Sequence, residues 1–283
     1  MAYPSNTNTS QNSELFAPLV TQAQYAAYEN SVARQLVTVF DAPTNTGKVL
    51  QVPVWSSISS QNITDEAAAT LKNTDTSSAT ITLSEHVVYH QVTDMVRDSA
   101  YNDVFASLGD QSGRAIAEGV DTQVFATFSN FSTDLGTANT AVTAQTIMKA
   151  AATLRGRKLT GPFYAVLHPA QAYGIKANLT ATTSYASVSN VGNDILSGFY
   201  IGTIAGVQIF ESALVPASGS ANNAVGAVFA PSAIGHAMRG SIDMNTLYLP
   251  ASRATDVVLK AVAGASVLNS TFGVAITGPS VIS

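Results

Sequence analysis

A long stretch of helical periodicity is the feature that most constrains the fold of this chain. Between residues 94 and 131, apolar side chains recur at steps of three and four residues, which places them on one stripe of a helix. They are Tyr101, Val104, Phe105, Leu108, Ile116, Val120, Val124 and Phe128. A single helix over residues 100–129 is roughly 45 Å long at about 1.5 Å per residue. That length is far above the average for a globular protein.

Two glycines leave the continuity of this helix open. Gly109 and Gly113 each cost about 1 kcal/mol relative to alanine in a helix interior. The sequence therefore allows one continuous rod, or a short lead-in followed by a second helix that Asp110 caps. The stripe alone is also what an ordinary core helix shows, so its surroundings must decide its role.

The chain before this helix predicts an arm and an extended hairpin. Residues 1–13 are polar and aperiodic, which is typical of a terminus that a partner orders. Residues 14–40 have helical spacing. In residues 46–92 the strand patterns KVLQVPVW and ATITLSEHVVYHQV flank a long polar tip. Because such a tip is unusual inside a compact domain, we expect a neighbouring subunit to order it, with a floppy surface loop as the alternative.

The remaining sequence predicts a mixture of helices and strands. We expect a helix over residues 143–154, the strand FYAVL, a helix that His168-Pro169 opens, a loop over residues 180–198, a hairpin that turns near Ala205-Gly206, and strands in AVGAVFA, SIDMNTLYL, DVVLKAVAGASVL and FGVAI. We expect the last strands to return to the long helix. No repeat or linker divides the sequence, so it predicts one α+β body with the arm and hairpin as appendages.

Composition narrows the classes of protein. Charged residues make up 11% of the chain, against roughly 25% in an average soluble domain. A surface so poor in charge suits subunits that cover one another. The net charge of -5 argues against a dedicated nucleic-acid binder. We interpret the basic cluster of Arg155, Arg157 and Lys158 as a helix C-terminus, with phosphate binding as the alternative.

Other classes are disfavoured by what the sequence lacks. The chain has no cysteine, which excludes disulfides, thiolate metal sites and a cysteine nucleophile. Its first residues have no basic and apolar regions of a signal peptide. Its longest apolar runs are shorter than the roughly 20 residues of a membrane-spanning helix. We therefore expect a protein that does not span a membrane and that is soluble or part of an assembly.

No group of residues predicts catalysis, a cofactor or a metal site. His86 and His90 lie in a strand pattern, about 13 Å apart, which disfavours a shared metal ion. The side chains of Asp65 and Glu66 are adjacent and diverge, unlike an acid/base pair. We expect Trp55, the only tryptophan, to be a packing anchor against the body or a neighbour.

The order of these elements resembles the major capsid proteins of tailed bacteriophages, which have the Hong Kong 97-type fold. Three further stretches carry the resemblance: EGVDTQVFATF at residues 118–128, the start of a helix at Leu167-His168-Pro169, and IAGVQIFESALVP at residues 204–216. The resemblance covers essentially the whole chain. It implies four parts: an arm with a helix over residues 1–45, an extended hairpin loop over 46–94, a peripheral domain with a spine helix from 95–140 and 241–283, and an axial domain over 141–240.

The resemblance also implies function and partners. Many copies would assemble as hexamers and pentamers into an icosahedral phage head that encloses double-stranded DNA without sequence-specific binding. Scaffolding, portal and decoration proteins are further expected partners, and assembly would take place in the host cytoplasm. Some relatives cross-link a loop lysine to an asparagine. For Lys72 and Asn269 this is disfavoured, because the reaction also needs a desolvated lysine and a nearby carboxylate.

Three alternatives remain. An encapsulin-like nanocompartment shell has the same fold but encloses a cargo protein. A β-rich surface or adhesion protein would share the Ser, Thr and Asn content and the low charge, although no export signal supports it. An enzyme would need a pocket with convergent titratable groups, which the sequence does not show.

Overall fold

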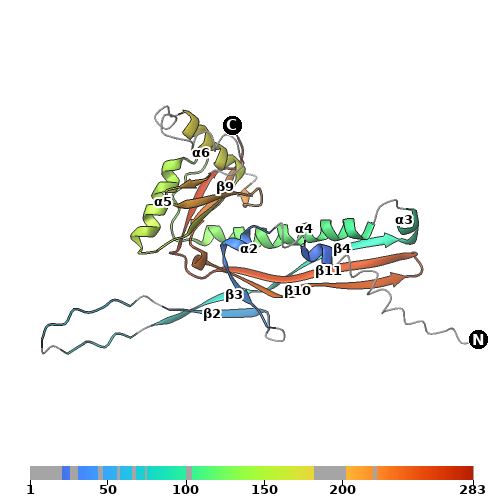
Figure 1. Cartoon of the computed structure of the whole chain (residues 1–283), viewed down its shortest axis with the longest axis horizontal. Helices are drawn as coiled ribbons and strands as arrows, with labels where there is room; N and C mark the ends of the chain where they lie inside the picture. Colours follow the sequence, from blue (N-terminus) through green and yellow to red (C-terminus); the bar gives the residue numbers. More distant parts are fainter. Residues whose placement is uncertain are drawn as a thin grey trace, which may run out of the picture.

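The computed structural model describes residues 21–25, 31–43, 47–55, 58–65, 68–73, 75–99, 104–181, 202–218 and 222–282. Within them, a long helix lies along one sheet, a second sheet with two helices packs at one end, and a two-stranded ribbon projects beyond the body (Figure 1). The molecule is therefore elongated.

The first sheet has four strands in the order β1-β10-β11-β4. These strands are β1 (Thr38–Asp41), β10 (Ile234–Leu249), β11 (Ala254–Val267) and β4 (Ser84–Thr93). β1 pairs with β10 in parallel, and the other pairs are antiparallel. The alternate residues Val257, Leu259, Ala261 and Ala263 of β11 are buried in one cluster with Ile116 and Val120. The period of two along the strand thus turns one face of the sheet toward the long helix.

The long helix is continuous through both glycines. α4 runs from Val104 to Phe125 over 22 residues, which corresponds to about 33 Å, and the 3-10 helix η1 (Ala126–Asn130) extends it. Gly109, Ser112 and Gly113 are all buried. Because these side chains are small, the helix can lie close to the sheet at this point. The alternative of a break between Gly109 and Gly113 is therefore wrong.

Most of the predicted apolar stripe is buried as expected. Ile116, Val120, Val124 and Phe128 are buried, and Leu108 is half-buried. Tyr101 and the side chains of Val104 and Phe105 lie outside the described residues. Before them, α3 (Asp94–Ser99) follows β4 directly.

The second sheet has the order β12-β9-β5-β7-β6, with β8 also paired to β9. Its strands are β5 (Phe163–Leu167), β6 (Thr203–Ile204), β7 (Val207–Glu211), β8 (Ala217–Ser218), β9 (Asn223–Phe229) and β12 (Gly273–Pro279). α5 (Ala144–Gly156) and α6 (Pro169–Ala181) share one buried core with it, through Ile147, Leu154 and Ile175. The predicted helix over 143–154, the strand FYAVL and the helix begun by Pro169 are confirmed. The predicted loop over 180–198 lies almost entirely outside the described residues.

The predicted helix over residues 14–40 is wrong at its C-terminal end. Residues 21–25 are helical and α2 covers Ala33–Leu36, but the chain then becomes β1. Val37 has φ −119° and ψ 165°, and β1 pairs with β10 from Thr38 onward. Backbone pairing with a long strand outweighs the weak helical preference of the β-branched residues here.

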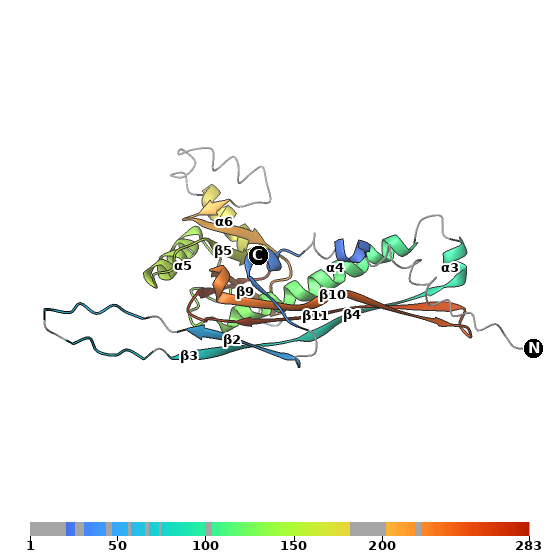
Figure 2. The ribbon, with the colours of Figure 1, turned by 60° about the horizontal axis from the view of Figure 1, so that its bottom comes forward.

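The predicted hairpin is present, but its second strand is divided between two sheets. β2 (Val49–Trp55) and β3 (Thr76–Thr82) form the antiparallel ribbon, and Leu83 separates β3 from β4. The N–H of Leu83 donates to the carbonyl of Lys48 at 2.8 Å, and Ile81 is fully buried at the base. The ribbon and its extended tip project away from α3, at the opposite end of the molecule (Figure 2).

Candidate functional site

The ribbon and its tip expose large apolar side chains. Trp55 is 68% exposed, Ile58 66% and Leu71 88%. Because Trp55 is mostly exposed at the end of β2, it does not anchor the ribbon to the described part of its own body. Packing against a neighbour, the other expectation from the sequence, stays a prediction. Exposed apolar side chains gathered on a projecting element are typical of a contact surface.

The tip has internal hydrogen bonds that join its two sides. The Gln61 side chain donates to the carbonyl of Thr70 at 2.9 Å and accepts from the Thr70 N–H at 3.0 Å. Lys72 Nζ donates to Ser59 Oγ at 2.5 Å. These bonds hold the two sides of the tip together as one unit. Asp65 is exposed in this tip, and Glu66 lies outside the described residues.

A second exposed apolar group lies at the far end of the first sheet, beside α3. Met95 is 78% exposed and Leu247 is 62% exposed. The Tyr248 hydroxyl donates to Asp94 Oδ2 at 2.9 Å, and the Asp94 N–H donates to the carbonyl of Arg253 at 2.9 Å. These bonds hold the end of β10 and the start of α3 together. With the ribbon at the other end, the molecule has exposed apolar side chains at both ends of its long axis.

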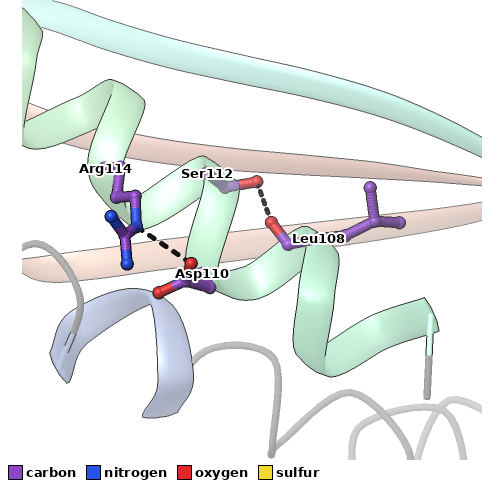
Figure 3. A network of polar contacts seen from close by, with 4 residues as sticks. All are labelled: Leu108, Asp110, Ser112 and Arg114. Carbon is purple, nitrogen blue, oxygen red and sulfur yellow. Dashed lines mark hydrogen bonds and ion pairs between the residues drawn. The ribbon is translucent and has the colours of Figure 1, made fainter. Parts of the chain in front are cut away.

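The two histidines singled out from the sequence each bond to α4 separately. His86 Nε2 lies 3.2 Å from Gln123 Oε1, and His90 Nε2 lies 2.9 Å from Ser112 Oγ. Ser112 Oγ donates to the carbonyl of Leu108 at 2.6 Å, as Figure 3 shows beside the Asp110–Arg114 ion pair. Since that hydroxyl proton is used, His90 Nε2 is the donor to Ser112. Within the described parts of the chain, no three His, Asp or Glu side chains gather as metal ligands would.

A third histidine on this sheet face was not singled out from the sequence. His236 of β10 is 0% exposed, and neither ring nitrogen has a hydrogen-bond partner among the described residues. Burial, and then the charges of Arg34 and His86, lower the pKa of His236 to about 4. His236 lines a cavity of about 260 Å³ between α2, α4 and β10. Nothing in the sequence signals this buried site, because a single histidine within an apolar strand forms no motif.

The basic cluster closes the end of α5, as its interpretation as a helix C-terminus predicts. Arg155 lies in the last turn and Arg157 is the C-cap residue. Arg155 Nη2 donates to the carbonyl of Ala205 at 2.6 Å, and Arg157 Nη2 donates to Thr133 Oγ1 at 2.6 Å. Ala205 and Gly206 have φ of 53° and 80° in the predicted β6–β7 turn. The two guanidinium groups therefore connect the end of α5 to this turn and to Thr133 in the segment that follows η1.

Lys72 and Asn269 are each bonded within their own segment. Asn269 Oδ1 accepts from the N–H of Thr271 at 3.0 Å and from Thr271 Oγ1 at 2.6 Å. This is an Asx turn between β11 and β12. Lys72 bonds to Ser59 in the tip. Both contacts hold the two side chains in local structure.

The chain that carries these surfaces matches a known protein family. The profile of the phage capsid protein family matches residues 76–275, which include β3, the first sheet apart from β1, α4 and most of the second sheet. The chain belongs to the phage capsid protein family. It is a structural major capsid protein of the phage head, and the expected α+β, Hong Kong 97-type fold is confirmed. No curated protein sequence matches it.

Solved structures of capsids share the fold of this capsid protein. The capsid of the cyanophage P-SCSP1u is similar with a TM-score of 0.68 and 20% identity, covering 87% of each chain. Mycobacterium phage Che8 gives a TM-score of 0.62 at 16% identity, over 92% of this chain and 90% of that one. The virus-like particle of Pyrococcus furiosus gives 0.60 at 12% identity, over 93% and 99%. No helix of the described residues is long and apolar enough to cross a membrane.

Proposed function

We propose that this capsid protein assembles as hexamers and pentamers into an icosahedral head around double-stranded DNA. The observation that carries the proposal is the ribbon, whose apolar side chains Trp55, Ile58 and Leu71 face away from their own body. Fully burying such a side chain contributes about 1.5–3 kcal/mol. Contact with a neighbouring copy would supply that burial at every subunit.

The backbone of the ribbon supports the same role. β2 and β3 form a two-stranded sheet, so among the described residues each strand has one edge without a β partner. Unpaired strand edges are a template for contact with another chain. The low charge of the chain adds to this, since subunits that cover one another do not need a strongly charged surface.

The division into capsid domains follows the same proposal. We assign residues 1–45 to the arm, 46–94 to the extended loop, 95–140 and 241–283 to the peripheral domain, and 141–240 to the axial domain. β12 (Gly273–Pro279) pairs with β9 in the second sheet, so the end of the chain contacts both domains. The protein contributes contacts and no catalytic group in this proposal.

Further partners are part of the proposal. The shell would enclose DNA without sequence-specific binding, meet scaffolding, portal and decoration proteins, and assemble in the host cytoplasm. An encapsulin-like shell would enclose a cargo protein instead. Nuclease-protected DNA in purified particles supports a phage head, whereas a single co-purifying cargo protein with no DNA contradicts it.

Assembly is tested by removing the exposed apolar side chains of the ribbon. The double variant Trp55→Ser, Leu71→Ser should express as folded protein but give smaller species in place of shells by electron microscopy and sedimentation. The matched control is Tyr173→Ser on α6, which is 53% exposed and should retain shells. Normal shells from the double variant would overturn the role of the ribbon.

A further inference from the structure

His236 is buried in an environment that suits only its neutral form. Its side chain is 0% exposed, and both ring nitrogens are without hydrogen-bond partners among the described residues. The adjoining cavity of about 260 Å³ is lined mainly by apolar side chains such as Ile116, Val120 and Ile242. A charge in such surroundings is costly unless a partner compensates for it.

The charged groups around His236 would not compensate a positive charge. From α2, Arg34 lines the same cavity, and its positive charge disfavours protonation of His236, as does the charge of His86 on β4. None of the residues that line the cavity is acidic. On α4, Asp121 is already bonded to Ser31 and to the N–H groups of Val32 and Ala33, and Glu118 is exposed. The residues paired with His236 in the sheet, Val39 and Ala265, do not titrate.

We propose that His236 is an acid-sensitive switch whose protonation releases α2 from α4 and from the face of the sheet. A protonated His236 would lie beside the Arg34 guanidinium in apolar surroundings. Displacement of α2 removes Arg34 and admits water to the cavity, so both cations are hydrated. α2 is the element that moves, because it has only four residues, whereas α4 and β10 are long and extensively paired.

The direction and range of the response follow from the pKa of His236. That pKa is lowered from 6.5 to about 4 in the closed state, so the open state binds the proton more readily. The closed state is favoured above pH 6.5 and loses this advantage as the pH falls from 6.5 toward about 4. Through His236 alone, the ratio of open to closed protein then rises about tenfold for each pH unit in that range.

Asp121 acts with the opposite sign. Burial raises the pKa of this carboxyl above 3.8, against the hydrogen bonds from Ser31 and from the backbone. Its protonation therefore favours the closed state. Acid release of α2 thus depends on His236, and without this histidine acid should leave α2 equally or more firmly held.

Hydrogen–deuterium exchange of the full chain, in the oligomeric form in which it is isolated, tests the switch. Protection of the amides at residues 31–36 is compared with that of α5 between about pH 7.5 and about pH 4.5, after correction for intrinsic exchange rates. We expect protection of α2 to fall about tenfold per pH unit below 6.5, with α5 unchanged. Unchanged protection of α2, or equal loss in α5, overturns the proposal.

Two variants and one control assign the effect to His236. His236→Gln should abolish the acid loss of protection in α2, since glutamine does not titrate in this range. Arg34→Gln, at a half-buried position, should make the loss smaller, because the neighbouring cation is removed. The control His168→Asn removes a histidine whose pKa burial also lowers and should leave the response intact. An unaltered response in His236→Gln and Arg34→Gln overturns the assignment.

Discussion

The hydroxyl of Ser31 donates a 2.7 Å hydrogen bond to Oδ1 of Asp121, across 90 residues of sequence. Oδ2 of the same carboxylate accepts from the N–H of Val32 at 2.9 Å and from that of Ala33 at 3.3 Å. Val32 is the N-cap residue of α2, and its side chain makes no capping bond. Asp121 of α4 therefore supplies the cap that the local sequence of α2 lacks.

Replacing Asp121 should loosen α2 according to how many acceptors remain. Asp121→Ala leaves a buried hydroxyl and two N–H groups without an acceptor, which costs about 2–4 kcal/mol. Asp121→Asn keeps one oxygen acceptor and should lose less. Denaturant unfolding at equal protein concentration measures both. Equal stability of Asp121→Ala and wild type would show that the cap contributes nothing.

The pH dependence of this site has a defined sign. Burial raises the pKa of Asp121 above 3.8, so the folded state binds its proton more readily than the unfolded state does. As the pH falls from neutral through that raised pKa, wild type should gain stability relative to Asp121→Asn. The difference in unfolding free energy between the two proteins, followed by denaturant titration at several pH values, isolates this effect because both contain His236. A constant difference would contradict it.

The aromatic cluster at the C-terminal end of α4 should contribute strongly to the stability of the fold. Phe128 is 0% exposed, and its ring centroid lies 5.4 Å from that of Phe125 and 5.5 Å from that of Phe229. Phe128→Ala should cost about 3–5 kcal/mol through lost burial and the cavity left behind, and Phe128→Leu should cost less. Thermal unfolding measures both, with exposed Tyr173→Ala as a control that should change little.

Gly136 permits a close approach of two backbones. A Cβ added there would lie 1.9 Å from the carbonyl oxygen of Thr277. The carboxylate of Asp134 holds the loop in place, because it accepts hydrogen bonds from the N–H and the hydroxyl of Thr277. Gly136→Ala should destabilise the protein by about 3 kcal/mol or more, because backbone atoms must move. The matched control is Gly156→Ala at the end of α5, where a Cβ meets nothing within 4 Å. It should be neutral or stabilise by about 0.5–1 kcal/mol.

Periodicity predicted most elements of this capsid protein because the same period that defines an element also defines its buried face. Ile116, Val120, Val124 and Phe128 are buried as their spacing indicates. The alternative of a break in the long helix was wrong, because it rested on the intrinsic helix preference of two glycines alone. Their intrinsic cost is real, but Gly109 and Gly113 lie on the buried face of α4, where packing on the sheet offsets it.

The positions that sequence reasoning missed depend on partners distant in the chain. β1 was read as helix because its pairing with β10 has no local signal. His236 and Asp121 gave no motif, since their roles come from burial between α2, α4 and the first sheet. The metal reading of His86 and His90 was disfavoured by strand spacing, but their actual partners on α4, Gln123 and Ser112, were not predictable from it.

The sequence by itself determined the order of most elements, the amphipathic face of the long helix and a hairpin with a long polar tip, because each depends on local periods and composition. Only the tertiary structure decided that α4 continues through Gly109 and Gly113, that Asp121 caps α2, and that His236 is buried without a hydrogen-bond partner among the residues that the structure describes. Those outcomes arise from contacts between different elements, such as the Ser31–Asp121 bond across 90 positions, for which a local pattern has no information.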